Sequence, residues 1–206
     1  MSDARYLVPK ETHRIEQVID RSRFLCTVSR VNSTDEAQAF IKSMNAEFPD
    51  ATHNCWAYVV GAPGSTDRIG MSDDGEPHGT AGRPMLTVLA HCGIGDIAAV
   101  VTRYYGGTKL GTGGLVKAYG GAVQECLASL PTEMRVDTVV GTFAVGYAHI
   151  GAVQQLLPTL EAEIVQQVFA VDAEFTVQLP RERSSELQSL LRNLTRGELA
   201  PIVWRE

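Results

Sequence analysis

The sequence has no pair of cysteines in a C-x-x-C arrangement and no long apolar run. Its four cysteines, Cys26, Cys55, Cys92 and Cys126, are widely spaced, which excludes a zinc ribbon and a thioredoxin-like motif. No apolar segment approaches the roughly 20 residues of a membrane-spanning helix. The first residues also lack the apolar core of a signal peptide. These absences predict a cytoplasmic protein, without a membrane partner, whose thiols are reduced and mostly buried.

An excess of basic residues is also missing, since the formal net charge of the 206-residue chain is -6. When the chain is divided after Met134, 12 Lys and Arg accompany 15 Asp and Glu in the first part, and 6 accompany 9 in the second. General binding to double-stranded DNA depends on many basic side chains at the phosphates. The composition argues against such binding, and any nucleic-acid contact must use a local patch.

Turn residues around Pro131 predict a boundary between two domains. Before the boundary, the patterns predict strands over 24–31, 55–60 and 97–102, helices over 34–44, 84–90 and 112–130, and an unbroken loop over 62–83. After it, they predict strands over 138–147, 164–169, 174–179 and 198–204 and helices over 151–160 and 182–194. The second order, β-α-β-β-α-β, is typical of a ferredoxin-like domain. The sequence therefore predicts an α+β protein with domains at 1–131 and 135–206.

The richest candidate site is the glycine-rich segment 103–117, which leads from a predicted strand into a predicted helix. Thr112 is expected to cap this helix, and Val116 and Tyr119 are expected in its buried stripe. Backbone N–H groups at the start of a helix bind anions, and tyrosine rings stack on nucleic-acid bases. The candidate residues for binding an anion or a nucleic acid are Arg103, Tyr104, Tyr105, Gly107, Lys109, Gly113, Gly114 and Lys117. A tight turn that needs glycine for its backbone angles is the other open interpretation.

Two nucleotide-binding motifs are incomplete in this segment. Gly106 and Gly111 have the spacing of a P-loop, but Thr112 and Gly113 stand where the P-loop requires Lys followed by Ser or Thr. Gly111 and Gly113 also begin a dinucleotide fingerprint, in which Val116 replaces the third glycine. No cofactor is predicted for the chain.

A second candidate is the acidic loop 72–83, in which carboxylates and a histidine are closely spaced. Such groups bind Mg²⁺ or carry out acid–base chemistry, whereas Asp-Gly and Glu-Pro are also turn signals that favour a solvated turn. No further ligand of suitable spacing is evident, so we predict no preformed metal site. The candidate residues of the acidic loop are Asp73, Asp74, Glu76 and Arg83.

His53 and Cys55 lie two residues apart on a predicted strand, and so on the same face. A Cys/His pair is one arrangement for nucleophilic catalysis. No third group that would orient the histidine is identifiable. The pattern therefore favours a packed thiol beside a hydrogen-bonded histidine.

Four stretches of the chain resemble the IMPACT/YigZ family, at 22–24, 53–57, 72–82 and 103–120. The last two are long and specific. The resemblance implies an N-terminal domain like the second domain of ribosomal protein S5 and a C-terminal domain similar to one in elongation factor G. Both likenesses point by analogy toward RNA or the ribosome.

Given this resemblance, our leading hypothesis is a non-enzymatic regulatory protein linked to translation. Its partner would be RNA, the ribosome or a translation factor. The alternatives are a small-molecule enzyme acting on a phosphorylated substrate and a plain protein-binding module. Both candidate loops are expected to line one surface, unless Asp74 and Arg103 simply form an ion pair that locks the acidic loop.

Overall fold

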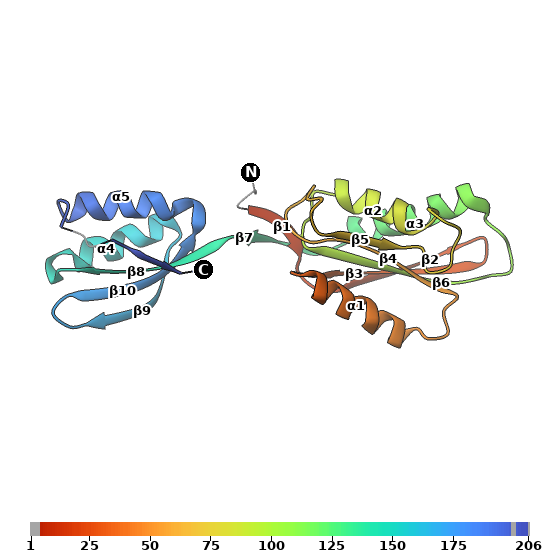
Figure 1. Cartoon of the computed structure of the whole chain (residues 1–206), viewed down its shortest axis with the longest axis horizontal. Helices are drawn as coiled ribbons and strands as arrows, with labels where there is room; N and C mark the ends of the chain where they lie inside the picture. Colours follow the sequence, from red (N-terminus) through yellow and green to blue (C-terminus); the bar gives the residue numbers. More distant parts are fainter. Residues whose placement is uncertain (1–4, 199–200, 206) are drawn as a thin grey trace. The chain divides into compact units, whose positions relative to one another are not determined.

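The computed structural model describes residues 5–198 and 201–205 and divides into two compact units, with the boundary between Arg135 and Val136. Figure 1 labels the helices and strands of both units. Within the described residues, no helix is both long enough and apolar enough to cross a membrane.

The first unit is built on a five-stranded antiparallel sheet in the order β2-β3-β6-β4-β5. Its strands are β2 (His13–Ile19), β3 (Ser22–Arg30), β6 (Ile97–Tyr104), β4 (His53–Val59) and β5 (Ile69–Ser72). A separate two-stranded sheet pairs β1 (Arg5–Pro9) with β7 (Thr132–Val136). The prediction of an unbroken loop over 62–83 was wrong, because β5 lies within it. This edge strand has only four residues, none of them buried, so the alternation of Ile69 and Met71 is too short to mark it.

Helices cover both faces of this sheet (Figure 1). α2 (Gly82–His91) and α3 (Gly111–Ala128) pack on one face, and α1 (Thr34–Glu47) packs on the other. β6 lies between the two layers, with Val101 facing α2 and α3 and Val100 facing α1. The predicted buried strand is therefore confirmed at the centre of the sheet.

The start of α3 differs from the prediction. Thr112 was expected to cap the helix, but the helix begins at Gly111, and Leu110 is its N-cap without a side-chain hydrogen bond. Val116 was expected in the buried stripe, yet it is exposed, and Leu115 is buried in its place. The N-cap thus lies two residues earlier than expected, and no side chain in the described part of the chain caps the first backbone N–H groups of the helix.

The second unit contains the predicted β-α-β-β-α-β order, with short 3₁₀ turns at the helix ends. Its four strands form an antiparallel sheet in the order β11-β8-β10-β9. The final strand is shorter than the predicted 198–204, of which 199–200 lie outside the described residues. The elements are β8 (Thr138–Val145), α4 (Ile150–Leu156), β9 (Glu163–Phe169), β10 (Ala173–Pro180), α5 (Ser184–Leu194) and β11 (Val203–Arg205).

Candidate anion-binding site

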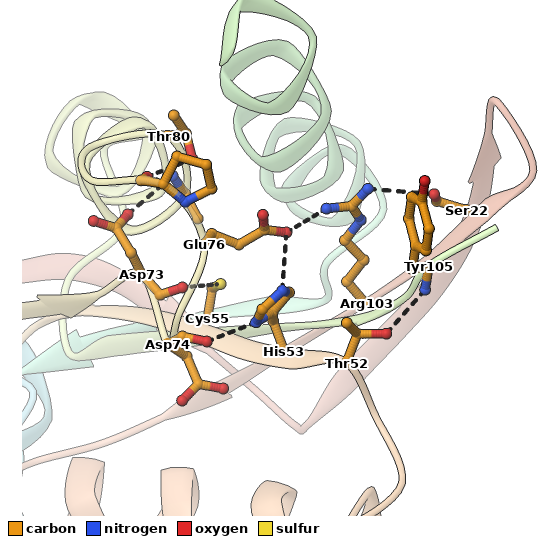
Figure 2. A network of polar contacts seen from close by, with 12 residues as sticks. Ser22, Thr52, His53, Cys55, Asp73, Asp74, Glu76, Thr80, Arg103 and Tyr105 are labelled. Atoms are coloured by element: carbon orange, nitrogen blue, oxygen red, sulfur yellow. Dashed lines mark hydrogen bonds and ion pairs between the residues drawn. The ribbon is translucent and has the colours of Figure 1, made fainter. Parts of the chain in front are cut away.

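A cluster of polar side chains lies where β4 and β6 approach the acidic loop (Figure 2). Arg103 of β6 pairs in register with Phe24 of β3 on one side and with His53 of β4 on the other. Directly paired residues of neighbouring strands share a face of the sheet. All three side chains are therefore on the face that carries α2 and α3.

A buried ion pair between Arg103 and Glu76 is the centre of the cluster. Arg103 Nη1 lies 2.5 Å from Glu76 Oε1, and the two side chains are only 6% and 4% exposed. The Tyr119 hydroxyl donates a 2.7 Å hydrogen bond to the same oxygen. Because both charges are buried, replacing either residue alone would leave the other charge buried without a partner and destabilise the fold.

The ion pair that was considered between Arg103 and Asp74 does not form, because Arg103 pairs with Glu76 instead. The Asp74 backbone is left-handed, with φ of 42°. Its carboxylate turns to accept a 2.6 Å hydrogen bond from the backbone N–H of Asn54. The Asp74 carbonyl lies 2.7 Å from His53 Nδ1, which must donate because a carbonyl only accepts. Asp74 therefore fixes the loop on β4.

Asp73 serves as a remote cap for α2. Its carboxylate accepts hydrogen bonds from the backbone N–H groups of Gly79, Ala81 and Gly82, at 2.8, 3.0 and 2.8 Å. Partial burial alone would raise the pKa of Asp73, but these backbone donors, together with His78, hold it below its ordinary value. The N-cap residue Ala81 has no side chain to do this, so Asp73 satisfies the helix start instead.

We expect Asp73→Asn to lower the free energy of unfolding by about 1–3 kcal/mol at neutral pH, because the amide keeps one acceptor and loses the charge. A carboxylate whose pKa is lowered on folding stabilises the fold above its unfolded pKa and loses that contribution as pH falls through the folded pKa. The difference between the wild type and the variant should therefore shrink on acidification below the ordinary value of 3.8. Urea titrations across the acid range measure it, and a difference that does not change with pH would contradict this role of Asp73.

Cys55 is a packed thiol beside a hydrogen-bonded histidine, as the sequence indicated. Its Sγ donates to the Asp73 carbonyl at 2.9 Å, and burial raises the pKa of the Cys55 thiol. Burial likewise raises the pKa of the Tyr119 phenol. The Cys55 sulfur stays protonated, so it is unsuited to nucleophilic attack.

A cavity of about 440 Å³, hereafter the α3 pocket, opens beside this cluster. The loop that leads into it turns at Gly107 and Gly111, whose φ angles of 86° and 70° confirm the need for glycine. The turn and the uncapped helix start thus occur together. The pocket is lined by Glu76, Pro77, Arg103, Tyr105, Lys109, Leu110, Gly111, Thr112 and Leu115.

The structure brings four of the predicted site residues to the pocket, namely Glu76, Arg103, Tyr105 and Lys109. Tyr105 is 46% exposed, and its backbone N–H is held by Thr52 Oγ1 at 3.0 Å. Leu110, Gly111 and Thr112 were not predicted as site residues. The position of Thr112 at the start of a helix could have indicated a site residue, but we interpreted Thr112 only as a helix cap.

The other predicted residues lie away from the pocket wall. Tyr104 is on the opposite face of β6 from Arg103, because successive residues of a strand alternate, and its hydroxyl donates to Asp50 Oδ1 at 3.0 Å. The carboxylates of Asp73 and Asp74 accept hydrogen bonds from backbone N–H groups. The lining of the α3 pocket also does not include the turn residue Gly107, the first-turn residues Gly113 and Gly114, or the exposed Arg83 and Lys117.

Tyr119 and Ser22 are part of the cluster, and sequence reasoning missed both roles. Tyr119 was assigned to the buried stripe of the helix, which is correct, but nothing in the pattern indicates that its hydroxyl reaches Glu76.

Across residues 5–198 and 201–205, no group of three or more His, Cys, Asp and Glu side chains is placed to hold a metal ion.

Comparison with known proteins places the pocket within a recognised domain. Residues 20–127 match the Impact N-terminal domain, and residues 143–198 match a domain of unknown function (DUF1949). The chain is 40% identical over 201 residues to the IMPACT family member YigZ of Escherichia coli, covering 98% of each chain. It is 39% identical over 196 residues to an IMPACT family member of Haemophilus influenzae, covering 95% of each. A crystal structure of a hypothetical protein, 38% identical, superposes with a TM-score of 0.70 over 99% of this chain and 98% of that one.

Proposed function

Because the chain belongs to the IMPACT family, we propose that it is a cytoplasmic regulatory protein linked to translation, which binds single-stranded RNA at the α3 pocket. We also propose that the domain at 1–131 is like the second domain of ribosomal protein S5 and that the domain at 135–206 is ferredoxin-like. The antiparallel strand order β11-β8-β10-β9 supports the second assignment.

The observation that carries the RNA proposal is the convergence of three different features at one cavity. The uncapped start of α3 offers free backbone N–H groups and the positive end of the helix dipole. Lys109 adds a full positive charge at the same place, and the half-exposed ring of Tyr105 offers a stacking surface. A phosphate and a base of one strand would thus be held together, which suits RNA whose bases are unpaired.

The geometry also limits the strength of this binding. Arg103 is neutralised by Glu76, so among the residues that line the pocket only Lys109 is a cation without a charged partner in the described part of the chain. We therefore expect weak binding with a shallow dependence on salt, corresponding to about one or two phosphates.

Lys109→Ala should weaken the binding of single-stranded RNA by a similar factor at every sequence tested, because Lys109 contacts phosphate rather than bases. The slope of affinity against salt should fall by about one. Fluorescence anisotropy at low and moderate salt measures both effects. The matched control is Lys42→Ala, since Lys42 is an exposed lysine on α1, which covers the other face of the sheet.

The same titrations decide among the three functional hypotheses. Equal losses in the Lys109 and Lys42 variants would remove the pocket from the proposal. If no RNA binds at low salt, the protein-binding module becomes the better explanation. Tight binding of a mononucleotide followed by its conversion would instead indicate a small-molecule enzyme.

A further inference from the structure

The α3 pocket contains a buried carboxylate as well as groups that attract anions. We infer that it takes one ribose 5′-phosphate unit, with the phosphate at the start of α3 and Lys109 and a ribose hydroxyl on Glu76. This inference deepens the proposed function and rests on it, since it specifies which part of an RNA strand enters the pocket.

The carboxylate of Glu76 has an oxygen available for a ligand. Oε1 accepts hydrogen bonds from Arg103 and Tyr119, at 2.5 and 2.7 Å. Oε2 accepts none from residues 5–198 and 201–205, and Figure 2 shows it turned away from Arg103 and His53. A carboxylate oxygen repels phosphate and accepts a hydrogen bond from a hydroxyl. Glu76 therefore selects for a ligand that carries a hydroxyl group beside its phosphate.

Arg103 provides a second, independent indication of a ligand. This side chain lines the pocket and is only 6% exposed, yet its Nε–H has no hydrogen-bond partner in the described chain. Nε and Nη2 lie on the same edge of the guanidinium, and the Nη2 bond to Ser22 Oγ is long at 3.4 Å. Buried donors are normally satisfied, so the lack of a partner for this one is unusual. The pocket thus presents the open acceptor of Glu76, with a buried donor of Arg103 beside it that has no partner among the described residues.

The size and charge of the pocket fit a single sugar phosphate. Its volume of about 440 Å³ is in the range of small-molecule sites, which enclose one such unit rather than a stack of several. A terminal phosphomonoester carries more negative charge than an internal diester, so a helix start and a lysine favour it. In an RNA strand, the 3′ oxygen of the first nucleotide is esterified, which leaves the 2′-hydroxyl to reach Glu76. The same chemistry is present in a free ribonucleoside 5′-monophosphate.

The test uses the unaltered protein and three single strands of about eight nucleotides, each labelled at its 3′ end. One is RNA with a 5′-phosphate, one is the same RNA with a 5′-hydroxyl, and one has a 5′-phosphate and 2′-deoxyribose at the first nucleotide only. We expect each of the two changes to weaken binding about tenfold, the usual effect of one hydrogen bond to a charged group. In Glu76→Gln, the preference for ribose should disappear while the preference for the 5′-phosphate remains. Because that variant loses a buried charge and can be unstable, the comparison of the strands on the wild type is decisive.

Calorimetry with uridine 5′-monophosphate and its 2′-deoxy form distinguishes the two sources of the ligand. If the free ribonucleotide binds with the same ribose preference and the strands do not bind, the inference stands and the proposed RNA function falls. If all three strands bind equally, the inference is overturned and RNA binding remains. If neither strands nor nucleotides bind at low salt, both are overturned.

Discussion

Replacing Arg103 by methionine is expected to lower the free energy of unfolding by about 3–5 kcal/mol, because it leaves the carboxylate of Glu76 buried without its cation. The Glu76 side chain is only 4% exposed, so water cannot replace the guanidinium. Tyr119 still donates to Oε1, and His53 Nε2 lies 4.0 Å from that oxygen. Neither group supplies the hydrogen-bonded charge of Arg103. Urea denaturation at neutral pH measures the loss.

Two further variants make this prediction specific. In the double variant Arg103→Met, Glu76→Met, most of the loss should be recovered, because no unpaired charge stays buried. The surface control is Arg23→Met, which breaks the ion pair between Arg23 and Glu16. The side chains of these two residues are 51% and 43% exposed. That change should cost less than about 1 kcal/mol. If Arg103→Met costs no more than the surface control, the buried pair does not hold the acidic loop in place.

Because Arg103 stabilises the fold, changing it to alanine together with Lys109 would weaken RNA binding through partial unfolding as well as through lost charge. Lys109 is exposed, and the hydrogen bonds and ion pairs among residues 5–198 and 201–205 do not involve it. Its removal therefore reports on binding alone, which is why the single Lys109 variant is the better probe.

The secondary structure was predictable where burial produces a clear period. The continuous apolar run at 97–102 marks β6, which is packed on both faces, and Ala37, Ile41 and Met44 mark the buried side of α1. β5 was not predictable, because an exposed four-residue edge strand is held by pairing with β4 and not by burial. The N-cap of α3 was misplaced by two residues, because Leu110 has no capping side chain that a sequence pattern could reveal.

The loops of the site were predictable, but their contacts were not. The sequence shows that Asp73, Asp74 and Glu76 are close along the chain. It does not show which of the three carboxylates reaches Arg103. The structure assigns the three carboxylates to three different partners, because the left-handed backbone at Asp74 and Gly75 turns successive side chains apart. Glu76 and Tyr119 are 43 positions apart in the sequence. Such a contact depends on how α3 packs over the sheet, which no local pattern specifies.

Gly106→Ala is expected to be the most damaging change in the glycine-rich segment. A Cβ at Gly106 would lie closer than 3.0 Å to backbone atoms of Arg21 and Ser22, a separation that real Cβ atoms essentially never show. The neighbouring turn cannot easily yield, since Asp20 and Arg21 already have left-handed φ angles of 45° and 68°. The Gly106 N–H also donates to Ser22 Oγ at 3.1 Å, which would be lost if the strands separated.

We expect Gly106→Ala to lower the free energy of unfolding by about 3 kcal/mol and to displace Tyr105, so that RNA binding falls even in the fraction that remains folded. The matched control is Gly113→Ala, in the first turn of α3, where an added Cβ meets nothing within 4 Å. Alanine is favoured over glycine in a helix by about 1 kcal/mol, so this control should be neutral or stabilising. Thermal and urea unfolding of both variants, followed by anisotropy below their melting temperatures, measures the contrast. Equal stability of the two variants would show that the turn between β2 and β3 moves freely. The close approach of Gly106 to that turn would then have no part in holding Tyr105 at the pocket.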